Sequence, residues 1–364
     1  MLPLFQHYPA LQSSLPHVAI GTLPTPVVPW SALGATAGVG TLYVKRDDLS
    51  GEPYGGNKVR KLEFLLARAQ ARGATSVLTF GAAGSNHALA TALYARQLGL
   101  HPISMLVPQQ NARNVQRNLL LGYAAGASLR LFGGRKLVSQ GTVEEVVAAC
   151  RSASGRPFII PAGGSAPLGV VGFVNAAFEL RAQVEAGQVP EPDRIYVASG
   201  TMGTCVGLLL GLAAAGLRTR VVAVRVTTAP YTTPEKARRL FARTLGLLRK
   251  ADGSFPALVF PEERFSLRDE FLGEGYARYT EAGAAAVRAA KEQEGVTLEG
   301  TYTGKALACL ISDGASGTLA NETALFWNTY NGRSQAEALK NVDYHQLPEA
   351  FHRYFQEPVQ ALDA

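Results

Sequence analysis

Lys58 is the residue whose type and position first suggest chemistry. It follows Gly55, Gly56 and Asn57 in the string GGNKVRKLE. It lies at the start of a stretch, residues 57–71, that has the apolar spacing of a helix. A cation at a helix N-terminus opposes the helix dipole by about 0.3–1 kcal/mol, which lowers the pKa of the amine. A lysine nucleophile or Schiff-base lysine requires such a lowered pKa. The alternative is that Lys58 and Lys61 are two solvated lysines on a surface helix.

A second candidate segment is the sequence GSNH. Ser85, Asn86 and His87 follow a short apolar run, residues 76–80, and begin a helical pattern over residues 85–98. Ser and Asn are common helix caps, so capping is one interpretation. The free amides of the same helix start also suit a substrate carboxylate, with the Ser85 hydroxyl offered to the reacting centre.

A third segment is rich in glycine and threonine. Residues 199–204 read SGTMGT and separate an apolar strand pattern at 195–198 from an apolar helix pattern at 203–215. Glycines let the backbone approach an anion closely, and Thr hydroxyls with free amides suit phosphate oxygens. The segment has neither the GK[ST] of a P-loop nor a G-x-G-x-x-G pattern, which disfavours a nucleoside triphosphate or NAD. A tight turn that requires glycine is the alternative.

The elements that position these segments are alternating apolar runs and helical stretches. Strands are predicted at residues 76–80, 102–107, 158–160, 195–198 and 221–226. Helices are predicted at residues 57–71, 85–98, 114–123, 143–152, 173–184 and 203–215. The alternation predicts an α/β protein with parallel sheet and helices on both faces. Ligands of such sheets bind at the carboxyl ends of strands, where the segments at 81–87, 161–165 and 199–204 fall.

Composition narrows the class of protein. The net charge is +7, but the basic residues are scattered, so nucleic acid is not an expected partner. The longest apolar stretch, residues 205–217, is too short for a membrane span, and no secretory-signal pattern begins the chain. Cys150, Cys205 and Cys309 are too far apart for a disulfide framework or a zinc site. We therefore expect no metal, no membrane contact and a reducing, cytoplasmic location.

Together these segments resemble one family of pyridoxal-phosphate enzymes, the aminocyclopropane-carboxylate deaminase and D-cysteine desulfhydrase group. The resemblance covers residues 42–331 and is carried by VKRDDLSGEPYGGNKVRKLEFL, the SNH helix start, IYVASGTMGTCVGL, the GY turn at 275–276 and TYTGKA at 301–306. It implies fold type II, which is tryptophan synthase β-like: two open, twisted, mostly parallel sheets flanked by helices.

The length and the resemblance together predict two domains. A chain of 364 residues is long enough for two. The resemblance implies a large cofactor-binding domain, residues 1–54 plus 164–364, with a small domain, residues 55–163, inserted in it. The Pro-rich first 40 residues are expected to be an irregular lead-in that wraps the body. A homodimer is also implied by the resemblance.

The resemblance also implies roles for residues of this chain. Lys58 is the expected Schiff-base lysine, and Ser85 is a further expected catalytic residue. Tyr276 and Tyr302 are expected to flank the substrate as proton donors or stabilisers. The other expected contacts of pyridoxal 5'-phosphate are Lys61, Asn86, Gly200, Thr201, Met202, Gly203, Thr204 and Thr329. The expected contacts of an amino-acid substrate are Ser85, Asn86, His87 and Thr303.

Thr303 bears on which reaction is catalysed. Deaminases of the family resemble VYEGK here and desulfhydrases resemble VYTGK, so Thr303 favours the desulfhydrase. The chain departs from the family's Asp-Pro-Val-Tyr at Glu299-Gly300, which predicts a looser turn before Tyr302. It also reads Asn-Thr-Tyr at 328–330 instead of His-Thr-Gly, which places a bulky Tyr330 beside the cofactor ring, and Arg278 is expected near the pocket rim.

The sequence therefore predicts a pyridoxal-phosphate-dependent lyase that removes the α-proton of a β-substituted amino acid and expels a thiol or sulfide. Aminocyclopropane-carboxylate deamination and a divergent biosynthetic reaction of the same family are the alternatives. A non-catalytic binder is disfavoured, because Lys58, Ser85, Tyr276 and Tyr302 are all present.

Overall fold

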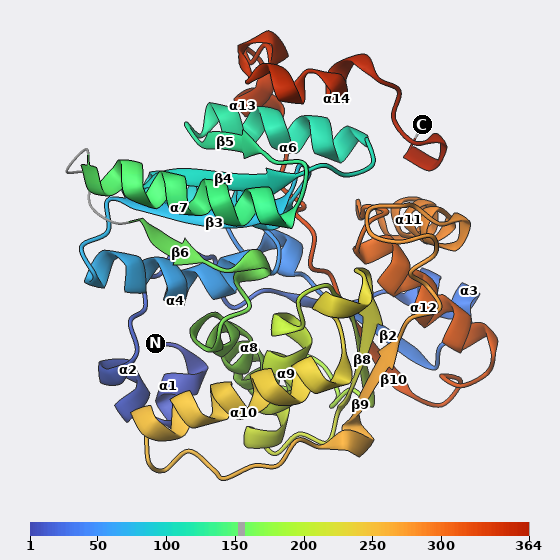
Figure 1. Cartoon of the computed structure of the whole chain (residues 1–364). Coiled ribbons are helices and arrows are strands. Elements are labelled where there is room, and N and C mark those ends of the chain that lie inside the picture. Colours follow the sequence, from blue (N-terminus) through green and yellow to red (C-terminus); the bar gives the residue numbers. More distant parts are fainter. Residues whose placement is uncertain (152–156, 364) are drawn as a thin grey trace.

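Two sheets, each flanked by helices, form the framework of the computed structural model, which describes residues 1–151 and 157–363 (Figure 1). The larger sheet has the strand order β1-β2-β10-β7-β8-β9. Its strands are β1 (Val27–Pro29), β2 (Thr41–Lys45), β7 (Arg194–Ser199), β8 (Arg220–Arg225), β9 (Phe265–Arg268) and β10 (Thr323–Trp327). Only the β1–β2 pair is antiparallel, and the other pairs are parallel.

The smaller sheet has the order β5-β4-β3-β6, and all its pairs are parallel. Its strands are β3 (Ser76–Ala82), β4 (His101–Val107), β5 (Ser128–Leu131) and β6 (Phe158–Ile160). These strands lie within residues 55–163 and the strands of the larger sheet lie outside that range. The domain boundaries themselves stay a prediction.

Helices α4 (Lys58–Ala71), α5 (Asn86–Gln97), α6 (Arg113–Ala124) and α7 (Arg135–Arg151) surround the smaller sheet (Figure 1). Helices α8 (Pro167–Glu185), α9 (Gly203–Ala214), α10 (Pro234–Ala251), α11 (Glu281–Glu294) and α12 (Thr303–Ala315) surround the larger one. The predicted strands and helices all fall on observed ones. Helix α7 begins eight residues before the prediction at 143–152, and Ser152 lies outside the described residues.

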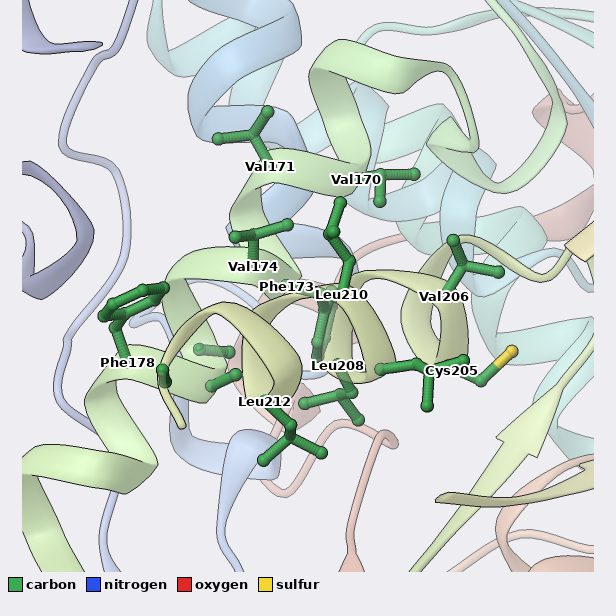
Figure 2. Close-up of a cluster of buried hydrophobic side chains, with 14 of the residues drawn as sticks. Val170, Val171, Phe173, Val174, Phe178, Cys205, Val206, Leu208, Leu210 and Leu212 are labelled. Atoms are coloured by element: carbon green, nitrogen blue, oxygen red, sulfur yellow. The ribbon is translucent and has the colours of Figure 1, made fainter. Parts of the chain in front are cut away.

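The main core lies where α8 packs on α9 (Figure 2). Helix α9 is apolar on every side, which is typical of a helix that is buried all round. Gly207 and Gly211 allow the close approach: a Cβ at these positions would lie 2.8 Å from the Val170 carbonyl oxygen and 2.6 Å from that of Val174. The packing fixes the start of α9, which carries the SGTMGT segment.

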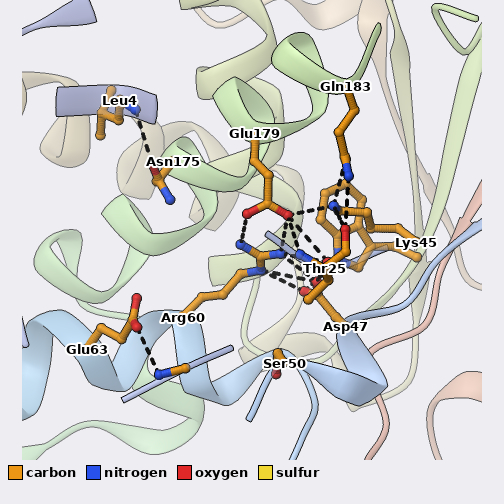
Figure 3. A network of polar contacts seen from close by, with 12 residues as sticks. Leu4, Thr25, Lys45, Asp47, Ser50, Arg60, Glu63, Asn175, Glu179 and Gln183 are labelled. Carbon is orange, nitrogen blue, oxygen red and sulfur yellow. Dashed lines mark hydrogen bonds and ion pairs between the residues drawn. The ribbon is translucent and has the colours of Figure 1, made fainter. Parts of the chain in front are cut away.

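A buried polar network joins α4 to α8 and to the N-terminal segment (Figure 3). Arg60 of α4 pairs with Asp47 at 2.7 Å and with Glu179 of α8 at 2.8 Å, and Lys45 pairs with Glu179 at 2.5 Å. Thr25 donates its hydroxyl to Asp47 at 2.9 Å. Because every charge has a partner, the network holds α4 in one position in the interior.

The N-terminal segment contains more regular structure than the expected irregular lead-in, and the C-terminal segment adds two short helices. The first 40 residues form β1 and three short helices, α1 (Pro3–His7), α2 (Ala10–Ser14) and α3 (Ser31–Ala37), so the lead-in is only partly irregular. Near the C-terminus, α13 (Ala336–Leu339) and α14 (Arg353–Gln356) lie against α6 (Figure 1). None of the helices among the described residues is long and apolar enough to cross a membrane.

Candidate active site

A cavity of about 530 Å³ opens where the carboxyl ends of strands from both sheets meet. Every site residue predicted from the sequence lines it. These are Lys58, Lys61, Ser85, Asn86, His87, Gly200, Thr201, Met202, Gly203, Thr204, Tyr276, Tyr302, Thr303 and Thr329. Lys58 and Thr329, 271 positions apart in the chain, are thus brought to one place by the fold.

Lys58 is the first residue of α4, held by the loop that follows β10. Gly56 has a φ of 97°, and a Cβ there would lie 2.8 Å from the Thr329 carbonyl oxygen, so the glycine is required for this approach. The Asn57 amide donates to the same oxygen at 3.2 Å, and Lys58 Nζ donates to Asn57 Oδ1 at 2.9 Å. Burial lowers the pKa of Lys58 to about 8, and the negative charge of Glu299 acts in the opposite direction by raising this pKa. Burial, rather than the helix dipole, is therefore the main cause of the lowered pKa.

The start of α9 forms a cradle for an anion. Met202 has a φ of 69° and directly precedes α9, whose first residues Gly203 and Thr204 line the cavity. The unpaired amides of a helix start suit an anion. Lys61 Nζ lies beside this helix start, donating to the Gly163 carbonyl at 3.1 Å and to Ser165 Oγ at 3.4 Å. A Cβ at Gly203 would fall 2.7 Å from Lys61 Nζ, so the glycine keeps this space open.

Lys61 is a buried amine, and none of the ion pairs formed within the described part of the chain includes it. Burial lowers its pKa well below the ordinary value, and the nearby Lys58 lowers it further. A buried charge without a counter-ion is unfavourable, and a bound phosphate at the start of α9 would supply one. The cradle therefore fits the phosphate of a cofactor.

The start of α5 supports both interpretations made from the sequence. Ser85 caps the helix by accepting the Ala88 amide at 3.2 Å, and its side chain also lines the cavity. Asn86 Oδ1 accepts from the Tyr54 hydroxyl at 3.0 Å and from Asn118 Nδ2 at 2.8 Å. Since its oxygen is occupied, the amide nitrogen of Asn86 is left to donate to a ligand.

His87 is buried at the same helix start, where its Nε2 lies 3.0 Å from Thr79 Oγ1. Burial lowers the pKa of His87 well below its usual value, and Lys58 and Lys61 lower it further. The imidazole is therefore neutral at neutral pH, so His87 can position a substrate carboxylate by hydrogen bonding but not by charge.

Tyr276 and Tyr302 form a hydrogen-bonded pair, with 2.6 Å between their hydroxyl oxygens and edge-on rings. Burial raises the pKa of Tyr276 to about 12 and raises that of Tyr302 well above its usual value. Both are therefore neutral phenols that donate protons. Lys305 of α12 fixes the turn before Tyr276 by donating to the carbonyl of Leu272 at 2.7 Å and that of Gly275 at 3.2 Å.

The predicted looser turn before Tyr302 is wrong. The Glu299 carboxylate accepts the amides of Thr301, Tyr302 and Thr303 at 2.7–3.0 Å, which ties the start of α12 tightly. Gly300 takes the family's proline position because the ring of Tyr279 packs on it, and a Cβ there would lie 2.6 Å from that ring. The longer Glu side chain thus keeps the turn closed around a residue without a side chain.

Tyr330 lines the cavity as expected, and Arg117 of α6 binds it. Arg117 Nη2 donates to the Tyr330 hydroxyl at 2.5 Å, and the guanidinium lies 5.6 Å from the centre of the Tyr330 ring. Arg278 is exposed and is not among the described residues that line the cavity, so its position near the pocket rim stays a prediction.

Four further residues shape the site and were not assigned to it from the sequence: Asn57, Glu299, Tyr54 and Asn118. Asn57 also donates to Thr204 Oγ1 at 2.9 Å, so it links the lysine to the anion cradle. Its place in the GGNK string was a usable signal. Tyr54 and Asn118 act through Asn86. Tyr54 directly precedes the GGNK string, whereas no local pattern marks Asn118.

Comparisons with known proteins agree with this geometry. Residues 18–329 match the family described as "Pyridoxal-phosphate dependent enzyme". The chain is 33% identical over 321 residues to a "Putative 1-aminocyclopropane-1-carboxylate deaminase" of Pyrococcus abyssi, covering 88% of this chain and 93% of the relative. It is 35% identical over 284 residues to a "D-cysteine desulfhydrase" of Salmonella schwarzengrund, covering 76% and 81%. A crystal structure of an ACC deaminase homologue superposes with a TM-score of 0.76 at 31% identity, covering 91% of this chain and 98% of that one.

The fold and the site define an enzyme of fold type II, with two mainly parallel sheets and a lysine and an anion cradle between them. The chain belongs to the pyridoxal-phosphate-dependent enzyme family, and pyridoxal 5'-phosphate is its cofactor. Lys58 and the cradle around Lys61 fit the aldehyde and the phosphate of that cofactor.

Proposed function

We propose that this enzyme is a D-cysteine desulfhydrase-like lyase, which converts a β-substituted amino acid to a 2-oxo acid, ammonia and a thiol or sulfide. The observation that carries the proposal is Lys58, a half-buried amine with a pKa of about 8, in one cavity with an anion cradle and two neutral tyrosines. Relatives named D-cysteine desulfhydrase support it.

Each residue has a task in the proposed reaction. Lys58 would hold the cofactor through its amine, and the phosphate would lie at residues 200–204 beside Lys61. When bound, pyridoxal phosphate supplies an electron-withdrawing ring that accepts the electron pair left by the departing α-proton. The Lys58 amine, displaced by the substrate amine, takes up that proton at Nζ.

The substrate would be oriented by the start of α5. Ser85 and His87 would bind its carboxylate together with the free amides of the helix, and Asn86 Nδ2 would donate to the cofactor's phenolic oxygen. The hydroxyl of Tyr276 or Tyr302 would protonate the leaving sulfur, and a phenol suits this task because it stays neutral at neutral pH. Thr329 would hydrogen-bond the pyridine nitrogen of the cofactor, and Thr303 would contact the substrate.

The test is a panel of D-cysteine, L-cysteine and 1-aminocyclopropane-1-carboxylate, scored for ammonia, 2-oxo acid and sulfide. We expect sulfide and pyruvate from D-cysteine. The Lys58→Ala variant should form neither product and should lack the visible absorption band of the cofactor. A purified protein that binds no added cofactor would contradict the proposal.

The second candidate function is 1-aminocyclopropane-1-carboxylate deamination. It is favoured by the relatives that carry the deaminase name and by the tyrosine pair, whose hydroxyls could protonate a ring carbon as the cyclopropane opens. Formation of 2-oxobutyrate from this substrate, without sulfide from D-cysteine, would establish it in place of the first.

We also propose that the enzyme is a cytoplasmic homodimer with the small domain at residues 55–163. The buried free thiols of Cys205 and Cys309 suit a reducing compartment, and the strands of the smaller sheet all fall within that range. Light scattering after size-exclusion chromatography tests the dimer, and a monomer at micromolar concentration would contradict it.

A further inference from the structure

One wall of the active-site cavity is apolar. It is formed by Phe80, Met105, Val107, Pro108 and Val138, which we call the apolar wall. Phe80 of β3 and Met105 of β4 are register partners, so their side chains lie next to each other on one face of the smaller sheet. Val138 reaches the same place from α7, which covers that face.

The apolar wall is anchored in the hydrophobic core of the smaller sheet. Phe80 and Val138 pack against a buried cluster of Leu78, Ile103 and Met105. Gly141, one turn after Val138, lets α7 approach closely, because a Cβ there would lie 2.5 Å from the Phe132 ring and 3.3 Å from the end of the Met105 side chain. A wall held by core packing keeps its shape when a ligand enters, so it selects among ligands.

The apolar wall begins beside the predicted carboxylate-binding residues. Gly81 follows Phe80 directly, and a Cβ at Gly81 would overlap the side chain of Ser85. Thr79, on the other side of Phe80, contacts His87 on the opposite face of the strand. Ser85 and the apolar wall thus lie on opposite faces of β3, but both line the one cavity that opens at the carboxyl end of this strand. A substrate whose carboxylate lies at Ser85 meets the apolar wall when its side chain extends past the end of β3.

The charged side chains that line the described part of the cavity already have other contacts. Among the described residues that line it, the lysines and carboxylates are Lys58, Lys61 and Glu299. Lys58 and Lys61 lie toward the cofactor, and the Glu299 carboxylate is occupied by three backbone amides. No charged side chain is thus available to a charged group at the far end of a substrate side chain.

We infer that the preferred substrate is a cysteine whose sulfur carries an apolar alkyl or aryl group, which packs on the apolar wall. The inference rests on the proposed function, and it names the substrate class. Loss of the α-proton to Lys58 and cleavage of the Cβ–S bond release the thiol, which takes a proton from a tyrosine. The reaction R–S–CH2–CH(NH3+)–COO− plus water then gives R–SH, pyruvate and ammonium.

The first experiment compares D-cysteine with its S-methyl, S-propyl and S-benzyl derivatives, in both enantiomers, using pyruvate as the common product. Burial of one methylene is worth about 0.8 kcal/mol, or about fourfold in kcat/KM. We expect kcat/KM to rise from the methyl to the propyl derivative by at least tenfold. Equal or falling values along the series would overturn the inference.

A pair of variants on one helix locates the effect. Val138→Asp places a carboxylate in the apolar wall and should lower the ratio of kcat/KM for the S-benzyl derivative to that for D-cysteine by more than tenfold. Val143→Asp, on the exposed side of α7, is the matched control and should leave this ratio unchanged. The same ratio in both variants would overturn the inference.

A binding measurement separates this inference from the proposed function. Norleucine and alanine have no leaving group, so titration of the cofactor's visible band by each reports affinity alone. Three additional methylenes predict about fiftyfold tighter binding of norleucine, and Val138→Asp should remove most of this difference. If no cysteine derivative is cleaved but norleucine binds more tightly, the proposed function fails and the apolar subsite stands. If alanine and norleucine bind equally, the subsite is refuted whatever reaction is catalysed.

Discussion

At the scale of single residues, the site depends on buried groups whose ionisation differs from that in water. Lys58 is a cation that the interior disfavours, so its neutral form, which reacts with an aldehyde, is populated near neutral pH. Burial raises the pKa values of Tyr276 and Tyr302, so both hydroxyls stay protonated near neutral pH. Burial thus prepares a base and two acids in one cavity, which is what α-proton removal and leaving-group protonation require.

The first prediction concerns the pH dependence of cofactor capture. Because burial lowers the pKa of Lys58 to about 8, its neutral fraction rises about tenfold per pH unit below this value and levels off above it. The rate at which cofactor-free protein regains the visible band should follow the same curve in stopped-flow absorbance. The Lys58→Ala variant should regain no band. A rate that keeps rising to about pH 10.4, the ordinary value for lysine, would contradict the prediction.

The second prediction concerns Glu299. Glu299→Gln replaces one acceptor oxygen with a donor that faces backbone amides, so either the hydrogen bonds from Tyr302 and Thr303 or the one from Thr301 are lost. We expect the free energy of unfolding to fall by about 1–3 kcal/mol and kcat to fall about tenfold or more, since Tyr302 is displaced. Urea denaturation and steady-state kinetics measure the two effects.

The control for that substitution is Glu292→Gln on the exposed side of α11, which should change neither quantity. If Glu299→Gln behaves like this control, the start of α12 does not depend on the carboxylate.

At the scale of elements, helix α4 is the part of the structure that positions the catalytic lysine. Its first residue is Lys58, and its third, Arg60, is fully buried between Asp47 and Glu179 (Figure 3). Guanidinium groups bind two carboxylates in a fixed planar geometry, so α4 cannot rotate or slide without breaking several bonds. The network therefore determines where the Lys58 amine lies.

The third prediction tests this anchor. Arg60→Met leaves Asp47 and Glu179 buried with less compensation, which should lower the free energy of unfolding by about 3–5 kcal/mol. Arg96→Met, on the exposed end of α5, is the control and should change stability by less than about 0.5 kcal/mol. Urea denaturation of both variants gives the comparison, and equal losses would show that the network does not hold α4.

At the scale of the whole molecule, the cavity is made by two sheets that meet at their carboxyl edges. The smaller sheet supplies the start of α5 and the apolar wall, and the larger sheet supplies the cradle, the tyrosines and Thr329. The bond from Arg117 of α6 to Tyr330 after β10 connects the two sides. Any movement that separates α6 from the loop after β10 has to break the hydrogen bond between Arg117 and Tyr330.

The fourth prediction follows from that connection. Tyr330→Phe removes the acceptor of Arg117 and should lower the free energy of local opening of α6 by about 1.5–3 kcal/mol. Native-state hydrogen exchange of the α6 amides measures this. Tyr123→Phe, within α6, is the control, because the Tyr123 hydroxyl has no hydrogen bond to another described residue. Unchanged exchange in Tyr330→Phe would show that the bond does not restrain α6.

The sequence alone determined the α/β alternation and the glycine-rich starts of α4, α5 and α9. It also singled out Lys58 as the candidate Schiff-base lysine. These features are encoded by neighbouring residues: apolar spacing, caps and glycine positions act over one or two helical turns. Strands β2, β5, β9 and β10 were not predicted, and neither were helices α10, α11 and α12. Strands β5 and β9 are four-residue segments with a charged side chain, so their local signal is weak.

Only the tertiary structure decided how the site residues are oriented. Tyr54 and Asn118 each act on Asn86 from 32 positions away, and Tyr330 meets Arg117 across 213 positions. The apolar wall likewise exists only because β3, β4 and α7 pack together. Contacts of this range depend on how two sheets meet, and no local pattern in the sequence contains that information.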